Sequence, residues 1–228
     1  KGQLNTEQAA FFMEKPVERL YNLEDDPYEI NNLAGEEKVV LKELRDRLNT
    51  WMIEKNDLGF FPENFLINRA LNNPVAFGIK HHKKIRQLIK IANWATGDWA
   101  KVKERVIETI MHGDEMERYW AYTVACAFGK EAKPDYHKFP DYKNETVPIV
   151  QLSAITFSGR VGASNPIPNL ITWLNQSIDP VANLIALNTL VYFKDHTPYG
   201  TNFNIDNLHL KVENDEVIRR LKYLDGTW

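Results

Sequence analysis

From Ile85 onward, six consecutive stretches carry apolar residues at every third or fourth position, and this pattern constrains the fold more than any other feature. The stretches cover residues 85–95, 99–110, 116–128, 150–161, 167–174 and 181–191. Such spacing puts the apolar side chains on one face of a helix. Gly, Asn, Ser, Asp and Pro separate the stretches and are typical helix ends. The sequence therefore predicts an array of short helices, closed by a terminal helix from about Asp215 to Leu224.

The array carries a weak internal period. Ala121, Ala154 and Ala186 occupy comparable mid-helix positions, 33 and then 32 residues apart, and Asp114 and Asp179 each lie seven residues before an alanine. A small residue at a helix crossing lets neighbouring helices approach closely. We therefore expect all three alanines to be buried. Residues 130–145, KEAKPDYHKFPDYKNE, break the pattern and predict an ordered loop in place of a second helix.

The N-terminal part follows a different pattern. Residues 20–23, Leu-Tyr-Asn-Leu, suit a short half-buried strand, and Asp25-Asp26-Pro27 forms a turn after it. These acidic residues also suggest a cation loop, but their spacing is not that of an EF-hand, so a solvated turn is favoured. A long amphipathic helix follows, with its apolar stripe at Val40, Leu44, Leu48, Trp51 and Met52.

Residues 15–62 resemble the segment with which sulfatases open their C-terminal subdomain. The resemblance lies in the order of types: the Leu20–Leu23 segment, the Asp-Pro turn, Glu29, then Asn32-Leu33-Ala34 and a helix reaching Trp51. Residues 146–193 resemble the short HEAT-like repeats at the C-termini of some bacterial sulfatases. The expected fold is mainly α, with a small α+β sulfatase-type subdomain at 1–72 and an irregular HEAT-like helical array at 73–228.

The resemblance implies a parent enzyme that hydrolyses sulfate esters or sulfamates on glycans, and a periplasmic or secreted location. Its formylglycine and calcium would lie in a catalytic domain outside this chain, which is the expected partner. Formylglycine arises from Cys or Ser in a Cys/Ser-x-Pro/Ala-x-Arg motif. The single cysteine, Cys126, lies in VACAFGK without that motif, and its place in a helix pattern favours a core residue. We expect no catalytic residue and no metal site in this chain.

Charge and composition narrow the functions further. The formal net charge of −3 over 228 residues does not indicate a nucleic-acid-binding surface. The chain also contains no apolar run long enough to span a bilayer. The first residue is Lys1, with neither an initiator Met nor a signal peptide, so we expect a fragment or processed product. The rival interpretation is a stand-alone helical-repeat scaffold for protein interaction, and the coding sequence upstream of Lys1 would distinguish the two.

The candidate ligand-binding residues are the basic run His81, His82, Lys83 and Lys84, between Lys80 and Arg86. A solvated helix start explains such a run. Contact with an anionic sulfated glycan, or with the acidic surface of a catalytic domain, also explains it. A second, weaker candidate is a carbohydrate platform built from aromatic residues in loops, namely Tyr136, Phe139, Tyr142 and Tyr199.

A last expectation concerns exposed apolar surface. Phe11 and Phe12, and again Phe60 and Phe61, flank the sulfatase-like segment in pairs and lie off any helical stripe. Without a catalytic domain beside them, we expect these four side chains to be exposed and to promote self-association.

Overall fold

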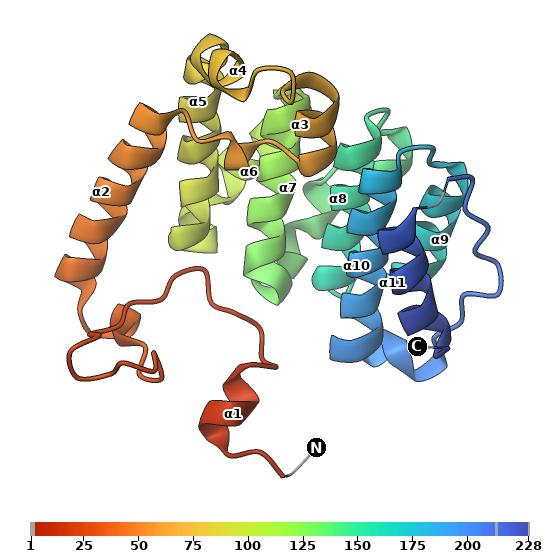
Figure 1. Cartoon of the computed structure of the whole chain (residues 1–228), viewed down its shortest axis with the longest axis horizontal. Helices are drawn as coiled ribbons and strands as arrows, with labels where there is room; N and C mark the ends of the chain where they lie inside the picture. The colour runs from red at the N-terminus through yellow and green to blue at the C-terminus, as the bar shows by residue number, and fades with distance from the viewer. Residues whose placement is uncertain (1–2, 213, 228) are drawn as a thin grey trace. The chain divides into compact units, whose positions relative to one another are not determined.

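The computed structural model describes residues 3–212 and 214–227 and is mainly helical (Figure 1). Two compact units divide the chain, residues 1–55 and 56–228. Residues 56–72, which were expected within the sulfatase-type subdomain, belong to the second unit by their contacts. The division into a sulfatase-type subdomain and a repeat domain stays a prediction.

The first unit contains α1 (Thr6–Ala10), the 3₁₀ turn η1 (Leu33–Gly35) and α2 (Lys38–Lys55). The expected strand at Leu20–Leu23 is wrong, and no strand occurs anywhere in the described ranges. The backbone of Leu20 bonds instead to the loop that precedes α2: its N–H donates to Asn32 Oδ1 (2.9 Å) and its carbonyl accepts from the N–H of Leu33 (2.8 Å). A strand needs a neighbouring strand to complete its ladder, and this unit supplies only a loop.

The turn after this segment has the predicted solvated form. The carboxylate of Asp26 accepts the backbone N–H groups of Ile30 (3.0 Å) and Asn31 (2.7 Å), so it folds the loop back on itself. Arg45 of α2 forms a bidentate ion pair with Glu18, and this pair holds the helix against the segment that precedes Leu20. Helix α2 ends where Asn56 takes a positive φ of 52°.

The second unit begins with the 3₁₀ turn η2 (Leu58–Phe60) and is built from short helices. These are α3 (Glu63–Arg69), α4 (Pro74–Lys80), α5 (His82–Ala92), α6 (Trp99–His112), α7 (Glu115–Phe128), α8 (Pro148–Arg160), α9 (Ile167–Gln176), α10 (Pro180–His196) and α11 (Asp215–Asp225), with 3₁₀ segments η3 (Asn93–Thr96), η4 (Gly129–Lys138), η5 (Tyr142–Asn144) and η6 (Pro198–Asn202). Helix α7 packs against α5, α6 and α8, and α10 packs against α9 and α11 (Figure 1).

The predicted stripes form most of the core of this unit. Fully covered side chains include Leu88, Val106, Val124, Phe157, Leu170, Leu187 and Phe193. In α10 the spacing in the sequence predicts a stripe of Val181, Leu184, Leu187 and Val191, of which Leu187 is buried and the other three are only partly covered. Ala182, Leu190 and Phe193 are buried as well. Helix α10 has neighbours on several sides, including α3, α8, α9 and α11, so a single stripe does not define its covered face.

The expectation for the three periodic alanines is confirmed, since Ala121, Ala154 and Ala186 are all buried. The two aspartates that precede them are both N-caps. Asp114 accepts the backbone N–H groups of Met116 and Glu117 at the start of α7, and Asp179 accepts those of Val181 and Ala182 at the start of α10. The terminal helix is also confirmed, as α11.

The four phenylalanines separate into two pairs with different environments. Phe11 is 80% exposed and Phe12 59% exposed, as expected. For Phe61 the expectation is wrong: it is buried, stacked on Phe65 with 5.3 Å between ring centroids and edge-on to Phe77. Phe60 is partly covered, and its ring centroid lies 5.3 Å from that of Trp120. The fold of the second unit therefore uses the second pair for its own packing.

Candidate functional site

The basic run occupies the junction between two helices. Helix α4 ends at Lys80, His81 links the helices, and His82 begins α5. Lys80, Lys83 and Arg86 are exposed, whereas both histidines and Lys84 are partly covered. No acidic residue occurs between Glu63 and Asp98, so the local excess of positive charge extends well beyond the run itself.

Lys84 is engaged by the neighbouring helix. Its Nζ contacts the carboxylates of Asp114 and Glu117, the latter at 2.9 Å. These two acids form the capping box of α7. Burial alone would lower the pKa of Lys84, but the bonds to both carboxylates raise it. Lys84 therefore acts as a cross-link between α5 and the start of α7.

The two histidines also have partners within the unit. His82 Nδ1 lies 2.7 Å from Asn56 Oδ1, and its Nε2 lies 3.2 Å from Nη2 of Arg86. The His81 ring stacks on Phe77 with 4.2 Å between centroids. Burial, together with the positive charge of Lys80, lowers the pKa of His81. Of the four predicted site residues, Lys83 is therefore the exposed one. The flanking Lys80 and Arg86 are exposed as well.

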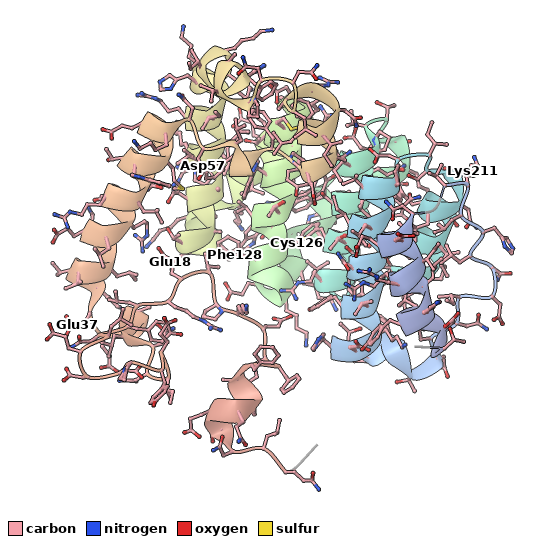
Figure 2. The ribbon with its side chains drawn as sticks, viewed as in Figure 1. Glu18, Glu37, Asp57, Cys126, Phe128 and Lys211 are labelled. Atoms are coloured by element: carbon pink, nitrogen blue, oxygen red, sulfur yellow. The ribbon has the colours of Figure 1, made fainter. Side chains whose placement is uncertain are left out.

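Cys126 lies on α7 (Figure 2), and its side chain is partly covered. Burial raises the pKa of its thiol to about 12, although Arg160 nearby acts in the opposite direction. A thiol with so high a pKa is protonated at neutral pH and is a poor nucleophile. This environment agrees with the predicted structural role.

The loop aromatics pack rather than form an open platform. Segment 130–145, predicted to be a loop, is largely the 3₁₀ helix η4. The Phe139 ring centroid lies 4.6 Å from that of Phe157 on α8, and Tyr136 lies against the same ring at 5.7 Å. Tyr142 and Tyr199 are both partly covered. The sequence could not show this because Phe157 is distant along the chain.

The carboxylate of Asp135, in η4, interacts with three side chains. It is 7% exposed and accepts hydrogen bonds from Trp99 Nε1 (3.0 Å) and from Lys103 Nζ (3.2 Å), with Lys138 Nζ also 3.0 Å away. Burial opposes ionisation, but the bonds to Lys138, Trp99 and Lys103 prevail and lower its pKa to about 2. This ion cluster holds η4 against α6.

The described part of the chain contains neither a cluster suited to a metal ion nor a helix suited to a membrane span. No group of three or more His, Cys, Asp or Glu side chains gathers there in an arrangement suited to a metal ion. Among the same residues, none of the helices combines the length and the apolar character that a bilayer span requires.

The second unit contains a cleft that no pattern in the sequence predicts. It lies between α3, the starts of α7 and α8, and the turn from α9 to α10, and its volume is about 340 Å³. Asn64, Arg69, Glu115 and Asp179 are among its lining residues. These residues come from separated segments with no common motif, so only the fold brings them together.

Comparison with known proteins gives one informative similarity. An ulvan-active sulfatase from Formosa agariphila is 40% identical over 75 residues, which cover 32% of this chain and 13% of the sulfatase. The chain thus spans only a small part of the length of that relative. No protein family matches the chain, and no solved structure resembles it. The partial similarity relates this chain to a sulfatase, in agreement with the resemblance found in the sequence.

Proposed function

We propose that the chain is the non-catalytic C-terminal portion of a sulfatase, which packs on and shapes the catalytic domain. This proposal rests on the solvent exposure of the apolar face of α2. None of its residues is buried, and its apolar stripe is open to solvent, with Val40 43%, Leu44 44%, Leu48 53% and Trp51 53% exposed. An amphipathic helix of this length gains its stability from packing its apolar face, so α2 requires a partner surface.

The partial similarity supplies the nature of that partner. The matched sulfatase has most of its length outside the similar region, which leaves ample chain for a catalytic domain. In this proposal the catalytic domain carries formylglycine and calcium, acts on glycan sulfate in the periplasm or outside the cell, and covers α2. The second unit is then a HEAT-like array attached to it, with the basic residues around Lys83 turned toward the anionic glycan or the acidic domain surface.

We expect the stripe on α2 to be essential for docking. In the full sulfatase polypeptide, Leu44→Asp combined with Leu48→Asp would place charges in an apolar interface, where unpaired charge is strongly unfavourable. The expected result is a parent enzyme whose C-terminal portion separates from the catalytic domain on limited proteolysis. Val39→Asp is the matched control, because Val39 is 82% exposed and lies on the adjacent polar face of the same helix.

Unchanged resistance to proteolysis in the double variant would contradict the proposed interface. Equal release by Val39→Asp would show that any added charge on α2 unfolds the helix, and that the stripe has no special role.

We also expect the isolated chain to release no sulfate from an aryl sulfate above the rate in buffer. The chain's only thiol is partly covered, has a raised pKa and lies outside a formylglycine motif. Sulfate release is measured by ion chromatography with the purified chain. Turnover that is lost in Cys126→Ala would show that Cys126 is a nucleophile after all, and would overturn the non-catalytic assignment.

A further inference from the structure

Helix α5 has two faces of opposite character. Its buried positions are all aliphatic, namely Ile85, Leu88, Ile89 and Ile91. Its exposed positions are all polar, namely Lys83, Arg86, Gln87 and Lys90. We call these four exposed residues the α5 stripe. The stripe carries cations and one amide, and it includes neither an acidic nor an apolar side chain.

The cations of the α5 stripe are not neutralised within the second unit. In the described part of the chain, no carboxylate forms an ion pair with them, and the acidic capping box of α7 contacts Lys84, which lies off the stripe. Arg86 contacts the His82 ring, which leaves the guanidinium charge uncompensated. No acidic residue occurs between Glu63 and Asp98. The stripe therefore favours an anion from outside the unit.

The spacing of the stripe suits a linear ligand. An α-helix rises about 1.5 Å per residue, so the step from Lys83 to Arg86 and Gln87, and the next step to Lys90, each cover about 5 Å. Residues three or four apart share one face of a helix, so the stripe is a straight row. Each step is close to the length of one sugar ring in an extended polysaccharide. A polysaccharide lying along α5 would thus place about one ring beside each helical turn.

The composition of the stripe distinguishes among anionic partners. The centre of a protein interface is enriched in aromatic residues and depleted in lysine, and a membrane-bound helix needs an apolar face. A single-stranded nucleic acid stacks its bases on aromatic side chains. The stripe offers none of these features, and the exposed aliphatic residues Val75 and Ile79 lie on α4, outside it. Cations together with an amide suit a ligand that carries both anionic groups and hydroxyl groups.

We propose that the α5 stripe binds a linear sulfated glycan, with successive sulfate groups on Lys83, Arg86 and Lys90 and a sugar hydroxyl on Gln87. This inference rests on the proposed function for the choice of sulfate as the anion. It assigns to the non-catalytic portion the task of holding the glycan chain while the catalytic domain cleaves its sulfate esters. Exposed charge pairs are individually weak, so the affinity depends on several pairs forming along one chain.

The first test varies only the sulfate content of the ligand. Hexasaccharides of ι-, κ- and β-carrageenan share one backbone and carry sulfate on every ring, on every second ring and on none. Each is titrated into the full chain, and ¹H–¹⁵N chemical-shift changes are followed. We expect saturable shifts centred on residues 80–90, strongest binding of the ι form, weaker binding of the κ form and none of the β form. Equal binding of all three forms, or shifts scattered over the surface, would overturn the proposal.

The second test varies the size and the chemical class of the ligand. An ι-carrageenan disaccharide cannot reach from Lys83 to Lys90, a distance of about 10 Å along the helix, and should bind more weakly than the hexasaccharide. Equal affinity would contradict binding along the row. Hexagalacturonate, hexathymidylate and hexaglutamate should each bind more weakly than the ι hexasaccharide. Equal or tighter binding of hexagalacturonate would overturn the choice of sulfate, and the same result for the other two would overturn the choice of a glycan.

Variants of exposed lysines locate the binding without disturbing the core. Lys83→Gln and Lys90→Gln should each weaken binding of the ι hexasaccharide about threefold, the effect of one exposed charge pair. The two sites are well separated, so the double variant should lose about tenfold. Lys222→Gln, at an exposed position of α11, is the matched control and should leave the affinity unchanged. Equal losses in the control and in the stripe variants would show a non-specific charge effect and exclude the site.

This result is independent of the docking test on α2. The stripe belongs to the second unit and α2 to the first. Absence of glycan binding, with the α2 variants still releasing the C-terminal portion, would overturn the stripe and leave the proposed function in place. Glycan binding without any effect of the α2 variants would contradict the proposed docking and leave the stripe in place.

Discussion

Gly159→Ala should destabilise the chain by about 1–3 kcal/mol, the usual cost of overpacking a core. Gly159 is buried in α8, where a Cβ atom would lie 2.5 Å from Pro166 Cγ and 2.6 Å from Phe193 Cζ. Phe193 is fully covered on α10, so its ring cannot swing into solvent. Alanine normally favours a helix over glycine by about 1 kcal/mol, and the steric conflict must exceed that gain.

Urea unfolding of the full chain measures this effect. Gly97→Ala is the matched control, because a Cβ atom at Gly97 would meet its nearest neighbours at 3.5 Å, an ordinary contact, and it should change stability by less than about 0.5 kcal/mol. The double variant Gly159→Ala/Phe193→Leu should recover part of the loss, since the smaller side chain leaves room for the methyl group. Wild-type stability in Gly159→Ala would show that α8 and α10 do not approach as closely as described.

Asp135→Asn should lower the free energy of unfolding by about 1–3 kcal/mol at pH 7, the range for losing hydrogen bonds to charged groups. The neutral amide leaves Lys103 and Lys138 without the carboxylate that they share, and it keeps at most the contact with Trp99. Asp46→Asn is the control for the same chemical change at an exposed ion pair, with Lys42 on α2, where the loss should be small.

The pH dependence gives an independent check on Asp135. Its pKa is about 2 in the folded chain and about 3.9 in an unfolded chain, so the unfolded state takes up a proton first as the pH falls. The stabilisation is fully present above about pH 4 and is lost as the pH falls toward 2. Stability of the wild type should therefore decrease more steeply than that of Asp135→Asn over this interval. Parallel pH profiles for the two proteins would contradict the described ion cluster.

Most helices of the second unit can be predicted from the sequence, because helix formation depends on local spacing and end signals. The stripe at Val102, Val106 and Ile110 predicts α6, and the buried face of α6 includes all three. The terminal helix begins after Asn214, whose side chain caps it, and ends at Gly226, which takes the left-handed conformation that glycine favours. These signals lie within a few residues of the element that they define.

Features that depend on distant partners cannot be predicted in this way, because they arise from how the folded segments pack together. Leu20–Leu23 has the composition of a strand, but strand formation requires a paired neighbour, and its backbone meets a loop instead. Lys84 looks like part of a free basic run, yet it binds two acids some thirty residues later in the chain. The cleft beside Asn64 likewise joins segments that no short-range pattern relates. Burial and charge pairing are set by which surfaces meet, whereas helical periodicity is set by the residues of each segment alone.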